Sequence, residues 1–177
     1  IPTCSAIQHP RAIVPLAPYL LGFWLGDGCR ASIGRVPEGK MEPLQACGGV
    51  LPPRASTSKP YLFYATVKNA KEKLSALGLF EKRSWEKFIP SCYLHASVEQ
   101  RVALLQGLLD TDGTVGKTGA ITFDSASEAL ADGVAELVRS LGGVARRGGR
   151  QGRIDGVDKR WSYRVFVALP MGVVPFR

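Results

Sequence analysis

The chain has 177 residues, of which 45% are hydrophobic and 21% are charged, a composition that is typical of a globular protein with a buried core. It contains no run of about 18 apolar residues and no basic and apolar N-terminal signal, so we expect an intracellular protein of the cytoplasm or nucleoid with no membrane partner. The net charge of +8 favours a polyanionic partner, because each lysine or arginine that neutralises a phosphate releases a counterion.

The first predicted element is an apolar helix that ends in Asp-Gly, with residues 20–28 reading LLGFWLGDG. One strand is expected over residues 29–36, followed by a Gly- and Pro-rich excursion to about residue 60 and a second strand over residues 61–67. The next segment, NAKEKLSALG, predicts a helix that Asn69 caps and Gly78 ends.

The second half of the chain is predicted to begin with another apolar helix. Ser97 and Gln100 have the spacing of a capping box at its start, and residues 105–113 at its end read LQGLLDTDG. Four further elements are expected downstream: a strand over 120–125, a helix over 127–141 that two glycines stop, and strands over 144–154 and 161–169.

The two helix-ending motifs repeat each other. They share a leucine, a glycine two positions later, two large apolar residues and a terminal Asp-Gly, and Asp27 and Asp112 stand 85 residues apart. A repeat of this length predicts two α/β units that pack as one pseudo-symmetric body. Because both motif helices are apolar nearly all round, we expect them to be buried.

Glycines within or at the end of these helices indicate a close helix–helix contact. Gly22, Gly26 and Gly107 each cost about 1 kcal/mol relative to alanine inside a helix, and small residues allow a second backbone to approach. If the two motif helices pack on each other, Asp27 and Asp112 emerge side by side at one end.

Paired carboxylates predict a metal site. Two neighbouring carboxylates repel, and one takes up a proton unless a cation lies between them. Hard divalent ions such as Mg²⁺ prefer carboxylate and carbonyl oxygens, and such ions near a phosphodiester activate water and stabilise the leaving oxygen. With its basic charge, the chain has the groups needed to cut both strands of a duplex.

Other interpretations of these patterns were weighed. A single Asp-Gly after a helix is typical of a C-terminal turn, and only its repetition in a matching apolar context favours a function. The DTDG segment lacks the further acids and the glutamate of a calcium loop. With no CxxC spacing and two histidines, a zinc site is not expected, and the cysteines are predicted to be free thiols: Cys4, Cys29, Cys47 and Cys92.

The motifs LLGFWLGDG and LQGLLDTDG resemble the two dodecapeptide motifs of LAGLIDADG homing endonucleases. The segment KFIPSCYLHASVEQRVALLQGLLDTDG is similar to the one that joins the halves of endonuclease domains carried by inteins. The resemblance runs from about Pro15 to the end of the chain. It implies an α+β fold of two pseudo-symmetric αββαββα halves, residues 1–96 with an N-terminal extension and residues 97–177, which form a DNA-binding saddle.

The resemblance also implies the site residues. The last Asp of each motif is the catalytic metal ligand in this family, which corresponds to Asp27 and Asp112, and the carbonyls of Gly26 and Thr111 would add to the coordination. Lys87 matches a lysine that assists catalysis. Its counterpart in the second half is either Arg177 or a residue beyond the given sequence.

The implied activity is a staggered, Mg²⁺-dependent double-strand cut at a long asymmetric DNA target by a monomer, with Ca²⁺ or Mn²⁺ able to replace Mg²⁺. Between residues 146 and 164 there are seven basic and two acidic residues, which also suits a solvated hairpin. Strand residues expected to face DNA are Arg30, Ser32, Arg35, Arg146, Arg147, Arg150, Arg153 and Arg164. No splicing blocks are found at either end, so we expect no protein splicing.

Two competing functions remain open on the sequence. RNA maturases and catalytically inactive DNA-binding proteins use the same fold, although two retained acids favour a nuclease. Aspartic proteases also have two pseudo-symmetric Asp-Gly halves, but their Asp stands in an Asp-Ser/Thr-Gly loop between strands. Here Asp27 and Asp112 follow helical runs, and the first motif has Leu25 and Gly26 where the family name spells Asp-Ala.

Overall fold

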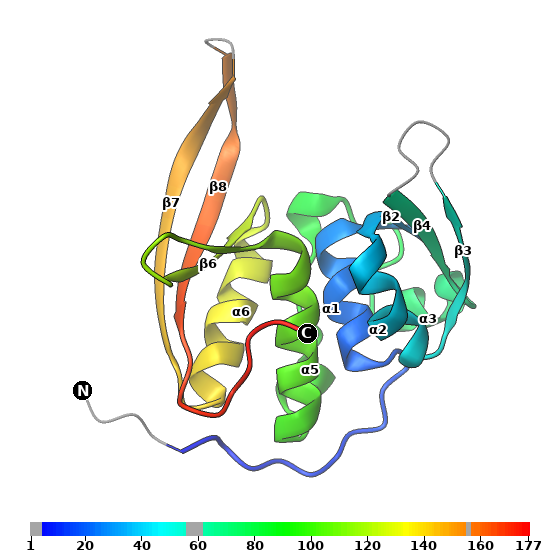
Figure 1. Cartoon of the computed structure of the whole chain (residues 1–177), viewed down its shortest axis with the longest axis horizontal. Coiled ribbons are helices and arrows are strands. Elements are labelled where there is room, and N and C mark those ends of the chain that lie inside the picture. The colour runs from blue at the N-terminus through cyan, green and yellow to red at the C-terminus, as the bar shows by residue number, and fades with distance from the viewer. Residues whose placement is uncertain (1–4, 56–61, 155–156) are drawn as a thin grey trace.

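The computed structural model describes residues 5–55, 62–154 and 157–177 (Figure 1). The elements of the first half are α1 (Pro18–Asp27), β1 (Gly28–Cys29), β2 (Ser32–Pro37), the 3₁₀ turn η1 (Glu38–Lys40), α2 (Met41–Ala46), β3 (Val50–Ala55), β4 (Leu62–Val67) and α3 (Ala70–Ala76). A connecting segment holds η2 (Ser84–Glu86) and α4 (Ser91–Leu94). The second half contains α5 (Val98–Asp112), β5 (Gly113–Val115), β6 (Ile121–Ser125), α6 (Glu128–Ser140), β7 (Val144–Ile154) and β8 (Val157–Ala168).

Each half contributes one antiparallel four-stranded sheet. The strand orders are β1-β2-β4-β3 and β5-β6-β8-β7, so the two sheets repeat one topology. The first half follows the whole αββαββα order, with the short α2 in the middle position. In the second half the described chain after β8 runs without a further helix to Arg177. The predicted α+β class, with two sheets of repeated topology, is confirmed.

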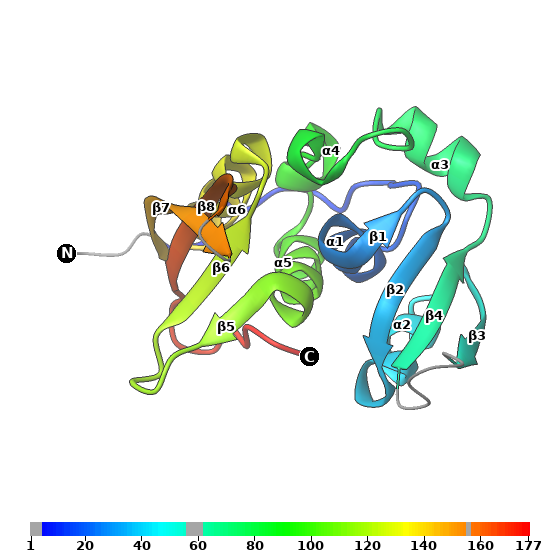
Figure 2. The ribbon, with the colours of Figure 1, turned by 90° about the horizontal axis from the view of Figure 1, so that it is seen from above.

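The two sheets stand on either side of a central helix pair and form a saddle. Figure 1 shows α1 and α5 side by side in the centre, with their C-terminal ends pointing up between the two sheets and the β7–β8 hairpin as the tallest arm. Seen from above, the ends of α1 and α5 lie on the floor between the sheets, whose upper faces are open (Figure 2). We call these open faces the groove faces; their exposed residues include Ser32 and Tyr64 on the first sheet and Arg146 and Phe166 on the second.

Glycine allows the central helices to touch through their backbones. A Cβ added at Gly22 would lie 2.2 Å from the carbonyl oxygen of Leu104, and one added at Gly107 would lie 2.2 Å from that of Tyr19. No side chain fits at either position without moving the backbone of the opposite helix. The predicted close contact of the two motif helices is therefore confirmed.

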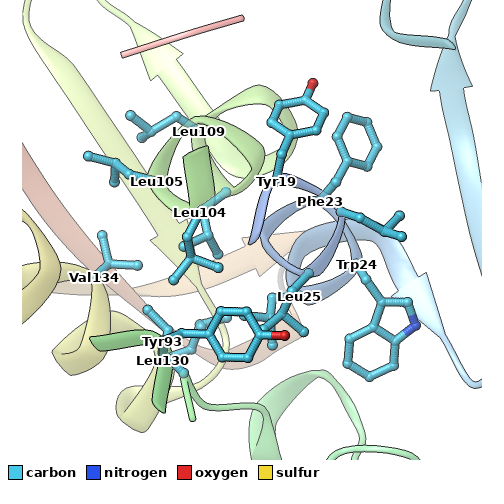
Figure 3. Close-up of a cluster of buried hydrophobic side chains, with 14 of the residues drawn as sticks. Tyr19, Phe23, Trp24, Leu25, Tyr93, Leu104, Leu105, Leu109, Leu130 and Val134 are labelled. Atoms are coloured by element: carbon cyan, nitrogen blue, oxygen red, sulfur yellow. The ribbon is translucent and has the colours of Figure 1, made fainter. Parts of the chain in front are cut away.

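One hydrophobic core runs through both halves. Every residue of α1 from Tyr19 to Leu25 is buried, as the sequence predicted. Figure 3 shows side chains of α1 packed with leucines of α5, with Tyr93 of α4 and with Leu130 and Val134 of α6. Continuous burial across the boundary fixes the two helix ends relative to each other.

Several local predictions are confirmed by hydrogen bonds. The Ser97 hydroxyl accepts the Gln100 N–H at 3.4 Å and the Gln100 side chain accepts the Ser97 N–H at 3.3 Å, which is the expected capping box. Gly78 has φ of +69°, a left-handed conformation that suits glycine after the end of α3.

Three local predictions were wrong. The single strand over residues 29–36 is a hairpin, because Arg30 adopts φ of +51° and its carbonyl accepts the indole N–H of Trp24 at 2.9 Å. The excursion from residue 37 contains η1, α2 and β3, with Met41 and Leu44 buried beneath them, while residues 56–60 lie outside the described ranges. Asn69 precedes α3 in the left-handed region, with φ of +53°, and makes no side-chain cap.

Two further expectations concern composition. Within the described ranges, none of the helices has the length and apolar character needed to cross a bilayer. Cys29, Cys47 and Cys92 are free, while Cys4 lies outside the described residues.

Candidate active site

Asp27 and Asp112 are the last residues of α1 and α5, and the two helix ends meet. A Cβ added at Gly26 would lie 2.0 Å from Oγ1 of Thr111 and 3.2 Å from Oδ2 of Asp112. The carboxylate of Asp112 therefore lies against the backbone that immediately precedes Asp27. Both acids emerge on the floor of the saddle, between the groove faces (Figure 2).

The electrostatics of Asp112 show that the pair is close. Burial first, and then the negative charge of Asp27 with a smaller contribution from Asp124, together raise the pKa of Asp112 from 3.8 to about 6. The ammonium of Lys87 acts in the opposite direction. Two carboxylates with this coupling favour a cation between them, because it removes both the repulsion and the tendency of Asp112 to protonate.

Lys87 caps the C-terminal end of α1. Its Nζ donates to the carbonyl oxygens of Gly28 at 2.8 Å, Leu25 at 2.9 Å and Trp24 at 3.1 Å, and lies 3.5 Å from that of Gly26. The side chain is 3% exposed, and Nζ also lies 4.7 Å from the centre of the Trp24 ring. A positive charge at this end complements the negative end of the helix dipole, and the ammonium gives the Leu25 carbonyl a donor in the last turn of the helix.

The charge state of Lys87 reflects its burial beside the acids. Burial lowers the pKa of Lys87 from 10.5 to about 8, a net shift that already includes the opposing effect of Asp112, Cys29 and Asp27. At neutral pH most of the Lys87 population is therefore protonated, and a positive charge lies next to the paired carboxylates.

Arg177 does not reproduce this arrangement at the end of α5. Its guanidinium lies 5.2 Å from the centre of the Tyr19 ring and 3.9 Å from Sγ of Cys47. Its backbone N–H is 3.4 Å from the carboxylate oxygens of Asp110. Of the two alternatives left open for the counterpart of Lys87, Arg177 is therefore not supported by the geometry.

Near the end of α5, the residue that corresponds to Leu25 of α1 is Asp110, a buried carboxylate. The Tyr19 hydroxyl donates to one of its oxygens at 2.7 Å, and the ammonium of Lys40 binds the other at 2.8 Å. The Asp110 side chain is 0% exposed, and Lys40 also donates to the carbonyl of Arg177. The sequence analysis assigned Asp110 no role. The sequence does contain a signal for this residue: where the first motif has Leu25, the second motif has an additional acid, Asp110.

The ligands at the helix ends suit a hard divalent ion. Among the residues that the structure describes, no three His, Cys, Asp or Glu side chains cluster as metal ligands. Asp27 and Asp112 instead offer two carboxylates beside the backbone carbonyls of Gly26 and Thr111. Mg²⁺ is commonly held by one or two carboxylates, with water and substrate phosphate oxygens completing its shell.

The predicted DNA-contacting residues of the second half divide between the two faces of their sheet. Arg147 points toward α6, where it pairs with Asp132 and with Glu128, the latter at 3.7 Å, and lies 5.5 Å from the centre of the Tyr163 ring. The prediction that Arg147 faces DNA is therefore corrected. Arg146, which immediately precedes Arg147 in β7, is exposed on the opposite face of the sheet, the groove face.

Arg164 lies on the groove face but is already paired. Its Nε and one terminal nitrogen bind the two oxygens of Asp124, each at 2.8 Å, across the β6–β8 register. Next to this pair, Phe166 is opposite Arg146 on one side and Thr122 on the other, and is 46% exposed. The sequence analysis did not name Phe166, because only polar and charged strand residues were taken as contacts to DNA.

The remaining predicted contacts are placed as follows. Arg150 is exposed opposite Ser162 on the second sheet. Ser32 is exposed opposite Thr66 on the first sheet, and Arg30 is exposed at the β1–β2 turn. The side chains of Arg35 and Arg153 lie outside what the structure describes. On the first sheet, exposed Tyr64 lies beside Gly34, another groove-face feature that the sequence analysis missed.

Comparison with known proteins agrees with this geometry. Residues 99–166 match the model of the LAGLIDADG-like domain. The replicative DNA helicase DnaB of Mycobacterium intracellulare is 37% identical over 137 residues, which cover 77% of this chain and 21% of the helicase. The chain thus spans about a fifth of the length of this curated relative.

Solved structures of the homing endonuclease I-DmoI share the fold. A structure from a study of its mesophilic variants has a TM-score of 0.56 and 16% identity, covering 88% of this chain and 89% of that one. The complex of I-DmoI with DNA and Ca has a TM-score of 0.58 and 15% identity, with 88% and 83% covered. The complex with DNA and Mn has a TM-score of 0.53 and 16% identity, with 87% and 89% covered.

The fold is that of the LAGLIDADG class. Residues 99–166 of the second half match the LAGLIDADG-like domain, and the whole chain has the LAGLIDADG fold seen in I-DmoI.

Proposed function

We propose that this chain is a metal-dependent, site-specific endodeoxyribonuclease that cuts both strands of a long, asymmetric double-stranded DNA target. The observation that carries the proposal is the meeting of Asp27 and Asp112 at two adjoining helix ends on the floor of a saddle. The net charge of +8 suits a polyanionic substrate, and the groove faces on either side offer exposed arginines and aromatic rings.

Asp27 and Asp112 would hold the metal, with the carbonyls of Gly26 and Thr111 as further ligands. Mg²⁺ is the proposed ion and Ca²⁺ or Mn²⁺ its substitutes, in keeping with the I-DmoI complexes that contain Ca, Mn or Mg. When bound, such an ion supplies an activated water and neutralises charge that develops on the phosphate.

The protein's own groups hold this centre rigid and place one positive charge beside the two acids. The glycine-mediated contact of α1 and α5 fixes the two carboxylates on packed helices, which is more precise than placing them on loops. The protonated Lys87 ammonium lies beside the acids, where it stabilises negative charge as the phosphodiester is cleaved. Its bonds to the carbonyls at the end of α1 keep it there.

The two groove faces would read the two halves of the target differently. On the second sheet, Arg146 is free to bind a phosphate or guanine edge, while Phe166 and Thr122 offer apolar and methyl contacts of the kind that thymine methyl groups accept. On the first sheet, Tyr64 and Ser32 hold the corresponding face. Because the faces differ and lie in one chain, we propose a monomer that binds a target that is not a perfect palindrome.

An origin in an intein is also proposed. The similarity to a replicative helicase is confined to about a fifth of that protein, while this chain has a LAGLIDADG fold. This is the pattern expected if an endonuclease domain is inserted within a host protein. The natural target would then be the insertion region of a helicase gene.

A second candidate, DNA binding with single-strand or no cleavage, is favoured by one observation. Among the described residues, the α5 end has the buried Asp110 carboxylate with Tyr19 and Lys40, and no lysine caps its carbonyls as Lys87 caps those of α1. If each helix end needs its own lysine to support cleavage, the strand that is cut at the α5 end would be cut slowly or not at all. An inactive DNA-binding protein or an RNA maturase of the same fold is the extreme form of this candidate.

The test is cleavage of a pooled library of long duplexes that includes helicase-gene insertion regions, with Mg²⁺ and with EDTA. We expect one Mg²⁺-dependent double-strand cut, with loss of at least one strand cut in Asp27→Asn and in Asp112→Asn and little change in DNA affinity. Tight, selective binding without a cut would instead support the second candidate. Loss of binding in both variants would contradict the assignment of the acids as metal ligands.

A further inference from the structure

We propose that Ser127, the N-cap residue of α6, is a positioning residue that holds the backbone of Lys87 and thereby keeps its ammonium at the end of α1. The inference rests on the proposed function, because it assigns Ser127 a role through Lys87. Ser127 belongs to the second half of the chain, whereas the site that Lys87 caps belongs to the first.

The Ser127 hydroxyl uses both its donor and its acceptor. It donates to the carbonyl oxygen of Lys87 at 2.6 Å and accepts the N–H of Leu130 at 3.1 Å, which caps α6. Its own N–H donates to Oγ of Ser125 at 3.0 Å. Ser127 is 1% exposed, so water does not replace these bonds when the hydroxyl is lost.

Lys87 is thus held from both halves of the molecule. Its Nζ binds carbonyls of α1, including that of Leu25 at 2.9 Å, and its own carbonyl binds Ser127. Two residues further along the connecting segment, Ile89 packs on α6, where a Cβ added at Gly133 would lie 3.2 Å from three of its side-chain carbons. The backbone around Lys87 is therefore seated on the start of α6, and Ser127 makes the directional bond.

Capping of α6 uses the Ser127 hydroxyl as an acceptor, whereas positioning of Lys87 uses it as a donor. Substitutions can therefore separate the two roles. Threonine keeps the donor and the acceptor. Aspartate is a good N-cap but, when ionised, has no proton to donate to the Lys87 carbonyl and repels it. Glycine is tolerated at N-caps, removes the donor and adds no charge, so Ser127→Gly serves if Ser127→Asp does not fold.

A matched control exists at another helix start. The Ser97 hydroxyl caps α5 by accepting the Gln100 N–H, and it donates to the side chain of Glu99 at 2.7 Å rather than to Lys87. Ser97→Ala therefore removes a helix cap of the same kind without touching the Lys87 backbone.

The experiment measures kcat and KM on the cognate duplex and, separately, the acylation of the Lys87 amine by mass spectrometry at one fixed pH. In Ser127→Asp and Ser127→Gly we expect kcat to fall at least tenfold, KM to stay within about threefold, and Lys87 labelling to rise severalfold. Ser127→Thr restores wild-type values in both assays, and Ser97→Ala leaves both unchanged.

Wild-type rates and Lys87 protection in a folded Ser127→Asp or Ser127→Gly protein would overturn the proposal, as would equal losses in Ser97→Ala. The labelling assay needs no DNA and no cleavage. If the wild-type protein does not cut DNA, the proposed function fails, while the protection of Lys87 still decides whether Ser127 positions it.

Discussion

The C-terminal ends of α1 and α5 carry the same Asp-Gly sequence but are stabilised in opposite ways. At the end of α1, a cation is buried: Lys87 donates to several backbone carbonyls of the helix. At the end of α5, an anion is buried: the Asp110 carboxylate is bound by Tyr19 and Lys40. Both halves therefore keep the acid at the end of the helix, but the groups around the two acids differ. For this reason the two strands of a target should be cut at unequal rates.

Replacing Lys87 and Lys40, the lysines that bind at the two helix ends, should break this comparison most strongly. Lys87→Met removes the ammonium beside the acids and leaves carbonyls of α1 without donors, so we expect cleavage of one strand to fall by about 10²- to 10⁴-fold, the range typical of a lost catalytic helper. Lys40→Met removes the ion pair with Asp110 and leaves the Lys87 cap in place, so the cleavage rate of either strand should change less than tenfold. End-labelled duplex resolves the two strands; equal loss on both strands in Lys87→Met would contradict unequal sites.

The backbone contact between α1 and α5 should be disrupted by a single added methyl group. Gly22→Ala and Gly107→Ala each place a Cβ 2.2 Å from a backbone oxygen of the other helix, so we expect a loss of about 3 kcal/mol or more in the free energy of unfolding. Gly39→Ala is the control, because nothing lies within 4 Å of a Cβ there. Urea unfolding measures all three. A loss of less than about 1 kcal/mol at Gly22 and Gly107 would show that the helices do not approach as closely as described.

The pH dependence of stability should reveal the cost of the paired acids. Because the pKa of folded Asp112 is raised from 3.8 to about 6, the folded protein holds this proton more tightly than the unfolded chain does. The resulting stabilisation is present below about pH 4 and is lost as pH rises through about 6. In EDTA, Asp112→Asn should therefore be more stable than the wild type at pH 7.5, by about 1–3 kcal/mol, and equal to it near pH 4. The same difference at both pH values would contradict a strained carboxylate.

The smallest predicted effect separates two neighbouring arginines. Arg146 is on the groove face, whereas Arg147 pairs with acids of α6. Arg146→Ala should weaken DNA binding and reduce the slope of log affinity against log salt by about 1, as the loss of one phosphate contact does. Arg147→Ala should leave that slope unchanged and lower stability slightly. The reverse result would place the sheet in the opposite orientation on DNA.

Much of the fold follows from sequence because the informative features are local or repeated. The capping box at Ser97 and the interhelical glycines Gly22 and Gly107 each have a direct physical consequence, and the structure shows it. The turn at Arg30 was missed because a non-glycine residue there is held left-handed by a bond from Trp24, a contact that no local pattern reveals.

The site was predictable only in part. The paired acids follow from the repeat, but the direction of Arg147 depends on strand register, and the partners of Asp110 come from segments far from it in sequence. The sequence analysis placed five arginines of the basic stretch on the DNA side: Arg146, Arg147, Arg150, Arg153 and Arg164. Sheet alternation divides them between two faces, and the assignment of Asp27 and Asp112 as metal ligands stays a prediction.

Metal-dependent stability tests the central claim most directly. Thermal unfolding of the wild type, Asp27→Asn and Asp112→Asn would be followed against Mg²⁺ and Ca²⁺, with the exposed acid Glu42→Gln as control. A native site raises the melting temperature by mass action, by an amount equivalent to about 2.7 kcal/mol at a hundred times the dissociation constant. We predict a rise in the wild type and in Glu42→Gln that shrinks in both Asp variants. An equal rise in all four proteins, or none in any, would contradict a metal centre built from the two helix ends.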